Sequence, residues 1–442
     1  MSPSRMSPVD HAWYRMDSPD NLMMVHAVMW TGKPLDWDLL RGEVADRMLE
    51  QFPKFRQHPV PASIPFTRAA WQDDPEFDLE RHVVQHRLPA PGDQRTLEDY
   101  ISSQIPLPLD PQHPMWQVHF IDGYADGSAV LYRMHHSIAD GITLNQVLLS
   151  LTNARAGSGF VASQSRGVLA QAADLARGVA SQSLQTVRQP ARLVSATTST
   201  VRGARRLVHL ATIPAKPRSA LSGDIGPTKR VTWTTAWRLP QLKAISRSAG
   251  VTVNDVLLSV LADALGRYLT EQGTPLDHVR VMVPVNLRAL DRPLINDLGN
   301  VFGEYVVTLP TGPMTPAQRL ARMNQIIREL KDSPEAVVAY LTLVAIGYLP
   351  EQIEDLSTRL FSGKIVATVS NVPGPTMQVR LAGTPVSGII GWVPAAGNVG
   401  LGVSMFSYAD RVVIGLITDT TLIPDAQRLV DLLHCALVDL ES

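Results

Sequence analysis

Apolar residues recur along the chain either at helical spacing or in short uninterrupted runs. The first helical pattern ends at Phe52-Pro53, and its apolar positions are Leu40, Val44, Met48 and Leu49. Thr96 is the expected N-cap of a second helix. The apolar run 129–132 predicts a strand, and a helix is expected directly after Gly141, with apolar positions at Leu144, Val147, Leu148 and Leu151.

The second half of the chain repeats this alternation. Helices are expected near Thr252, at Thr315-Pro316 and at Pro424-Asp425, because a capping side chain or a proline suits the first turn of a helix. Strand-like runs cover 279–283, 365–369, 401–407 and 412–418. Mixed strands and helices in both halves predict an α+β fold of two lobes.

Length supports the same division. With 442 residues and 45% hydrophobic content, the chain exceeds what one core usually holds. We expect an N-terminal lobe over 1–154, a basic helical connector over 155–227 and a C-terminal lobe over 228–442.

The expected connector changes in composition to Ala, Ser, Gln, Val and Arg. Four arginines, Arg155, Arg166, Arg177 and Arg188, recur every eleven positions, which keeps them near one stripe of a helix. Two interpretations stay open: a solvated helical linker, or an amphipathic basic surface that docks on anionic lipid.

Charge and composition exclude several classes of protein. A net charge of -1 gives no long-range attraction for nucleic acid. The N-terminus carries no signal-peptide pattern, and the longest uncharged stretch, 336–350, is shorter than the ~20 residues of a membrane span. That stretch predicts a buried helix. Cys435, the only cysteine, is expected to be a small core residue of a cytoplasmic protein.

The candidate chemistry lies in the segment 134–141, Met-His-His-Ser-Ile-Ala-Asp-Gly, directly after the apolar run 129–132. Histidine is the side chain best suited to accept and return a proton near neutral pH. Neighbouring side chains of an extended segment point to opposite faces, so only one of His135 and His136 faces a given cavity. The alternative is that both are ordinary polar residues at a strand end. A metal site is disfavoured, because opposed imidazoles cannot chelate one ion.

Further motifs, together with this one, resemble the bacterial wax ester synthase/diacylglycerol acyltransferase family. They stand in the family's order and span nearly the whole chain: Ser7-Pro8-Val9-Asp10, Pro108-Leu109-Asp110, Pro114-Met115-Trp116, Val253-Asn254-Asp255-Val256, Pro284-Val285-Asn286-Leu287-Arg288 and Ser370-Asn371-Val372-Pro373-Gly374-Pro375. The family usually has Pro-Leu-Trp where this chain has Pro114-Met115-Trp116, a swap that conserves volume. The resemblance implies two chloramphenicol acetyltransferase-like lobes, each a mixed sheet flanked by helices.

By the same resemblance, His136 is the general base and His135 keeps the loop in shape. Asp140 is expected to hold the loop by pairing with an arginine, Arg56 first and Arg288 second, rather than to orient His136 directly. Pro114 and Trp116 are expected to buttress the loop.

Gly141 permits a close backbone approach or an unusual dihedral angle, and its N–H is one candidate oxyanion donor. Asn254 is the other candidate, although capping of a helix explains Asn254 equally well on local grounds. Ser370, Asn371 and Gly374 are expected to shape the substrate channel.

The resemblance implies transfer of a fatty acyl group from acyl-coenzyme A to diacylglycerol or a long-chain alcohol, without a cofactor. No Gly-x-Ser-x-Gly nucleophile motif occurs. This chemistry requires the His136 ring to lie along an open passage. Peripheral contact with the inner membrane face or lipid bodies is an expectation, and the oligomeric state stays open. Two alternatives remain: a condensation-type transferase that uses a carrier-protein thioester, and a non-catalytic scaffold on lipid droplets.

Overall fold

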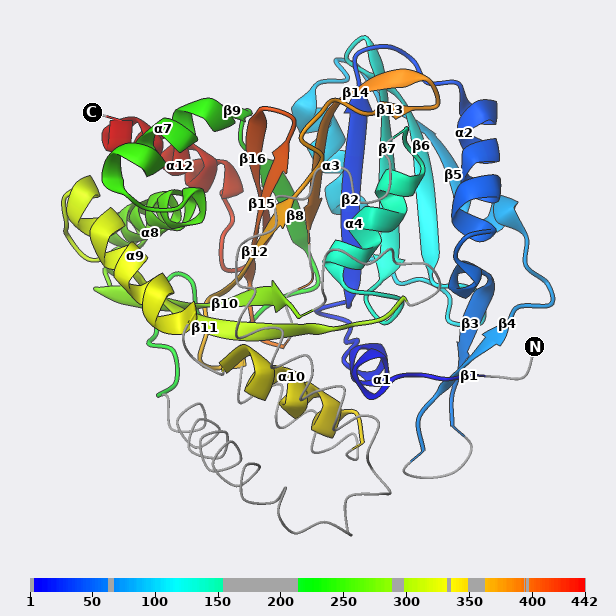
Figure 1. Ribbon diagram of the computed structural model, residues 1–442, viewed down its shortest axis with the longest axis horizontal. Coiled ribbons are helices and arrows are strands. Elements are labelled where there is room, and N and C mark those ends of the chain that lie inside the picture. Colours follow the sequence, from blue (N-terminus) through cyan, green and yellow to red (C-terminus); the bar gives the residue numbers. More distant parts are fainter. Residues whose placement is uncertain are drawn as a thin grey trace.

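The structure is a computed structural model, and it describes residues 4–62, 67–153, 214–287, 298–331, 335–348, 362–392, 394 and 397–441. Figure 1 shows two lobes side by side, each built on a β-sheet with helices packed against it. The predicted α+β fold of two lobes is therefore confirmed.

The N-terminal lobe contains a six-stranded sheet in the order β13-β14-β2-β7-β6-β5 and a small sheet in the order β1-β4-β3. All nine residues of β7 are buried, because this apolar run lies between β2 and β6. The strands that the first part of the chain contributes are β1 (Ser4–Arg5), β2 (Met24–Thr31), β3 (Gln57–Val60), β4 (Ala70–Asp73), β5 (Val83–Arg87), β6 (Trp116–Tyr124) and β7 (Gly127–His135). Its helices are α1 (Pro8–Arg15), α2 (Trp37–Glu43) with a π-helical continuation (Val44–Leu49), α3 (Gln94–Gln104), α4 (Gly141–Ser150) and the 3-10 turns Pro53–Arg56 and Leu79–Arg81.

The C-terminal lobe contains a sheet in the order β11-β10-β12-β15-β16-β8, with β9 paired to β16. Its long helix α8 packs against α7, α9 and α12 (Figure 1). The strands of this sheet are β8 (Lys229–Trp233), β9 (Trp237–Arg238), β10 (His278–Asn286), β11 (Phe302–Pro310), β12 (Ala367–Pro373), β15 (Leu401–Tyr408) and β16 (Arg411–Asp419). The helices are α7 (Leu239–Ala249), α8 (Val253–Glu271), α9 (Pro316–Lys331), α10 (Glu335–Ile346) and α12 (Ala426–Glu441).

One pair of strands crosses between the lobes. β13 (Arg380–Leu381) and β14 (Thr384–Trp392) come from the second half of the chain, yet β14 pairs antiparallel with β2 of the N-terminal sheet. Leu221, from the end of the expected connector, is buried in the core of the C-terminal lobe. The lobes are therefore not consecutive segments divided at residue 228. The four arginines of the expected connector, and all of 154–213, lie outside the described residues.

Several helix starts match the sequence patterns. Thr252 caps α8, and its hydroxyl accepts the Asp255 N–H while the Asp255 carboxylate accepts the Thr252 N–H. The cap predicted at Thr96 is wrong, because α3 begins earlier with Asp93, whose carboxylate accepts the Thr96 N–H at 2.9 Å.

The core position predicted for Cys435 is also wrong, since this thiol is exposed. It lies on the outer face of α12, whose inner face carries Leu432, Leu433, Ala436 and Leu437.

The uncharged stretch 336–350 contains most of α10, as expected for a helix. Figure 1 shows α10 beneath β11 and next to α1, and both elements contact it. Among the described residues, the only apolar sequence long enough for a membrane span is α7 and α8 taken together, which bend by 97° where they meet. Most of α8 is packed into the core.

Candidate active site

The histidine loop, residues 136–140, joins the end of β7 to the start of α4. The backbone at its start is fixed on both sides: the His135 N–H donates to the Met115 carbonyl at 3.0 Å, and the His136 N–H donates to the Met23 carbonyl at 2.7 Å. Met115 belongs to the motif that was expected to buttress the loop. Its neighbour Trp116 is buried and donates from Nε1 to the Phe55 carbonyl at 2.8 Å.

His135 is held by hydrogen bonds at its Nδ1 nitrogen. Its Nδ1 accepts the Ser137 N–H at 3.1 Å and lies 2.8 Å from the Ser137 hydroxyl. Its Nε2 lies 3.2 Å from the Asp17 carboxylate. An imidazole held in this way suits a structural role in the loop, which is the role that the family resemblance implies for His135.

His136 faces a different environment. Its ring stacks on Trp13 of α1 with centroids 4.1 Å apart and lies 5.8 Å from the Phe302 ring of β11. Burial lowers the pKa of His136 to about 4, although the nearby Asp140 charge acts in the opposite direction. The ring is therefore neutral at pH 7 and able to accept a proton.

His136 is largely buried, where an open passage was expected. The residue is 5% exposed, and Nδ1 is sealed from solvent without a hydrogen-bond partner among the described residues. Trp13 and Phe302 cover the ring because α1 and β11 pack together over the loop in one apolar cluster.

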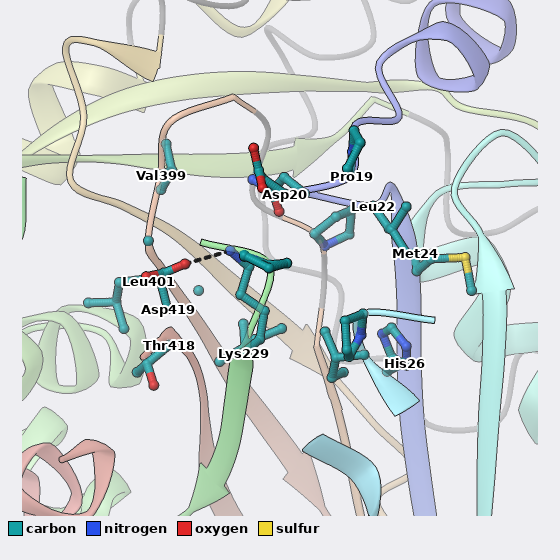
Figure 2. A pocket seen from close by; sticks show the side chains of 18 residues that line it. Pro19, Asp20, Leu22, Met24, His26, Lys229, Val399, Leu401, Thr418 and Asp419 are labelled. Carbon is teal, nitrogen blue, oxygen red and sulfur yellow. Dashed lines mark hydrogen bonds and ion pairs between the residues drawn. The ribbon is translucent and has the colours of Figure 1, made fainter. Parts of the chain in front are cut away.

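A hollow of about 30 Å³ lies between the lobes, and no residue of the histidine loop lines it. Figure 2 shows Asp20, Met24 and His26 on one side and Lys229 and Asp419, joined by an ion pair of 2.7 Å, on the other. A volume of this size accommodates about one water molecule. The hollow is therefore no substrate channel in this conformation.

The arginine partner predicted for Asp140 is not Arg56. The Asp140 carboxylate caps α4 by accepting the Thr143 N–H at 2.8 Å, and its other oxygen accepts the Val301 N–H at 3.1 Å. Arg56 is exposed, with its guanidinium over the Phe77 ring at 5.8 Å. Asp140 therefore holds the loop through backbone amides. Arg288, the second candidate, lies outside the described residues.

A lysine contacts the loop instead. Lys54, two residues before Arg56, donates from Nζ to the Ile138 carbonyl at 2.7 Å. Its Nζ also lies 3.3 Å from the carboxylate of Asp10, which the motif at 7–10 contains. Lys54 was not among the residues predicted from the sequence, and its position two residues before Arg56 was the only signal that pointed to it.

Gly141 is the first residue of α4 and does not adopt a positive φ, so of the two features that a glycine permits there, the unusual dihedral angle is absent.

Two motifs of the second half contact each other. Asn371 Nδ2 donates to Asn254 Oδ1 at 2.9 Å, which joins β12 to the first turn of α8. Thr252 and Asp255 cap α8, so capping does not account for Asn254. Ser370 is buried and donates to Ser404 at 3.2 Å. At Gly374 a Cβ atom would lie 2.3 Å from the Ser407 carbonyl, so only glycine fits.

Within the described part of the chain, no group of three or more His, Cys, Asp or Glu side chains is arranged to hold a metal ion.

Comparisons with known proteins agree with this architecture. The profile of the wax ester synthase/diacylglycerol acyltransferase catalytic domain matches residues 6–257, and that of the WS/DGAT C-terminal domain matches residues 298–441. Two probable diacylglycerol O-acyltransferases of Mycobacterium tuberculosis, tgs1 and tgs2, are each 28% identical. The alignment with tgs1 covers 81% of this chain and 78% of the relative, and that with tgs2 covers 88% and 87%.

Solved structures share the fold. A wax ester synthase/diacylglycerol acyltransferase from Marinobacter aquaeolei VT8 superposes with a TM-score of 0.70 at 24% identity, over 99% of this chain and 98% of that one. The starter condensation domain of rhizomide synthetase RzmA superposes with a TM-score of 0.62 at 12% identity, over 100% and 95%. Because the two family profiles together match most of the sequence, the chain belongs to the wax ester synthase/diacylglycerol acyltransferase family.

Proposed function

We propose that this acyltransferase transfers a fatty acyl group from acyl-coenzyme A to the hydroxyl of diacylglycerol or a long-chain alcohol, with His136 as general base. The ring takes the hydroxyl proton while the oxygen attacks the thioester carbonyl. The C–O bond forms, the C–S bond breaks, and the thiolate recovers the proton from the imidazolium. The products are an ester and free coenzyme A, and no enzyme-bound intermediate is needed.

The observation that carries the proposal is the state of His136. Burial lowers its pKa to about 4, so the ring stays neutral at working pH, and backbone hydrogen bonds of its own and neighbouring residues fix the loop. His135, by contrast, lies close to the Asp17 carboxylate through its Nε2. Of the two imidazoles, we assign the base to His136, since Ser137 and Asp17 flank the two nitrogens of His135.

Asn254 is our candidate for the oxyanion donor. The Asn254 Oδ1 atom accepts the hydrogen bond from Asn371, so the Asn254 Nδ2 group is not used in that contact and is able to donate to the oxyanion. Asn371 then acts by fixing the orientation of the Asn254 amide. Gly141 retains a backbone N–H in the first turn of α4, where intrahelical partners are missing.

Contact with a membrane or lipid body belongs to the same proposal, because the acceptor lipid is apolar. The basic segment expected to make this contact lies outside the described residues. Replacing all four arginines of this segment with glutamine (Arg155, Arg166, Arg177 and Arg188) should weaken binding to anionic liposomes. If binding is unchanged, the interpretation of the segment as a solvated linker is the one that remains.

The test incubates the protein with palmitoyl-coenzyme A and either hexadecanol or diacylglycerol, and measures the ester by mass spectrometry and the released thiol with a colorimetric reagent. Cys435 is exposed and reacts with that reagent, so the assay uses a Cys435→Ser background. We expect His136→Ala to lose at least a hundredfold in kcat.

The matched control is His278→Ala, since His278 is exposed at the start of β10. Wild-type turnover by His136→Ala would refute the base assignment. Absence of ester with both acceptors would favour a carrier-protein thioester or a scaffold.

A further inference from the structure

A buried hydrogen-bond network outside the histidine pair centres on Asn300, which precedes β11 and is 3% exposed. Its Nδ2 group donates one hydrogen bond to Asp10 Oδ1 at 2.8 Å and another to the His136 carbonyl at 2.9 Å. Both protons of the amide are therefore used, and one of them fixes the backbone of the candidate base.

The Asp10 carboxylate anchors this amide from α1. Its Oδ1 also accepts the Asn300 N–H at 3.0 Å, and its Oδ2 lies 3.3 Å from Lys54 Nζ. Lys54 donates in turn to the carbonyls of Ile138 at 2.7 Å and Ser137 at 3.4 Å. The charges of the Asp10 carboxylate and the Lys54 ammonium thus offset each other. The carboxylate binds Asn300, and the ammonium binds carbonyls of the histidine loop.

Residues on either side of Asn300 fasten the same loop. The Gly299 carbonyl accepts the Asp140 N–H at 3.4 Å, and the Val301 N–H donates to Asp140 Oδ2 at 3.1 Å. Three consecutive residues that lead into the C-terminal sheet therefore hold the loop that follows β7 of the N-terminal sheet.

We propose that Asn300 is a positioning residue for His136: its amide sets the His136 backbone and ring across the junction of the lobes, and Asp10 and Lys54 hold that amide in place. The inference rests on the proposed role of His136 as base. Asn300 Oδ1 is buried without a hydrogen-bond partner among the described residues, so it is able to accept a hydrogen bond from the protonated His136 ring. In agreement, the Asn300 side chain raises the pKa of His136, against the larger effect of burial.

The test compares Asn300→Ala with wild type in the esterification assay across pH. We expect kcat to fall about tenfold to a hundredfold, because a ring displaced by about 1 Å loses that much. We expect the KM for palmitoyl-coenzyme A to change less than threefold. The acidic limb of the kcat/KM profile should move to lower pH, since a group that raises the pKa of the base has been removed.

The matched control is Gln94→Ala. Gln94 Nε2 also donates two hydrogen bonds, one to the Glu98 carboxylate of the same helix at 2.8 Å and one to the Trp233 carbonyl of β8 at 2.9 Å, and neither partner belongs to the histidine loop. We expect this variant to lose thermal stability and to keep the wild-type kcat and pH limb. A loss of kcat in Gln94→Ala equal to that in Asn300→Ala would overturn the proposal.

If Asn300→Ala does not fold, Asn300→Ser keeps one donor, and Asp10→Asn with Lys54→Met removes both buried charges together. Each variant should lower kcat and move the acidic limb of the kcat/KM profile to lower pH. A folded variant of either kind that keeps the wild-type kcat and the wild-type pH profile overturns the proposal. His136→Ala separates the two hypotheses: if it is inactive while Asn300→Ala is fully active, only the positioning role fails. If His136→Ala is active, the proposed base fails first.

Discussion

At the scale of single residues, Asp140 is held by two backbone amides, the Thr143 N–H at the start of α4 and the Val301 N–H before β11. A loop that carries a base needs such anchors, because a shift of about 1 Å costs about a hundredfold in rate. Among the described residues, hydrogen bonds from backbone amides, and not an ion pair with Arg56, hold Asp140.

Substitutions at Asp140 distinguish these two ways of holding the loop. Asp140→Ala removes the cap and leaves the Val301 N–H without a partner, so we expect it to lower the free energy of unfolding by ~2–3 kcal/mol. Asp140→Asn keeps a side-chain oxygen for the cap and should lose less than half of that. Urea denaturation measures both, and equal losses would indicate that the charge itself matters.

Trp13 controls the environment of His136. The ring stack at 4.1 Å keeps water from the imidazole, and this burial is the main reason for its lowered pKa. Trp13→Ala should move the acidic limb of the kcat/KM profile up in pH toward 6.5, because a base with a higher pKa becomes protonated sooner as the pH falls. Trp13→Phe, which keeps an aromatic cover, is the control. A limb unchanged in Trp13→Ala would show that Trp13 does not set the pKa.

At the scale of elements, the start of α8 shows how a cap and a site residue share one turn. Thr252 and Asp255 satisfy the free amides of the helix, and Asn254 between them turns to Asn371 of β12. The two functions are therefore separable by mutation.

We expect Thr252→Ala to lower the free energy of unfolding by ~1 kcal/mol with little change in kcat, and Asn254→Ala to cost less than ~0.5 kcal/mol and to lower kcat. Thermal denaturation and the esterification assay measure the two effects. A stability loss in Asn254→Ala as large as that in Thr252→Ala would restore the capping interpretation.

At the scale of the whole molecule, the lobes depend on each other. β14 completes the N-terminal sheet at β2, and Trp233 and Phe406 from the second half pack into the core of the first lobe. Without β14, the β2 edge would offer unpaired backbone groups to other chains.

Residues 1–227 expressed alone should therefore aggregate or lack fixed packing, as measured by soluble yield, near-ultraviolet circular dichroism and binding of a hydrophobic dye. Co-expression of 228–442 should restore a folded complex. A cooperative unfolding transition of 1–227 alone would contradict this dependence.

The sequence by itself determined several of the elements and the candidate chemistry. Periodicity and capping residues are local signals, so the strands around 279–283 and 412–418 and the helix starts near Thr252 and Thr315 follow from them. The motif at 134–141 lies at the end of a strand, as expected, and it is recognised from neighbouring residues alone. The resemblance to the family is what linked this motif to a particular chemistry.

Only the tertiary structure decided which distant groups meet. Asn300 lies 164 positions from His136 along the chain, and Lys54 lies 84 positions before Ile138, so no local pattern reveals these contacts. The same holds for β14 in the N-terminal sheet and for the Trp13 cover. Packing, not composition, chose Lys54 over Arg56 at the histidine loop, because only Lys54 reaches the buried carbonyls while Arg56 stays in solvent.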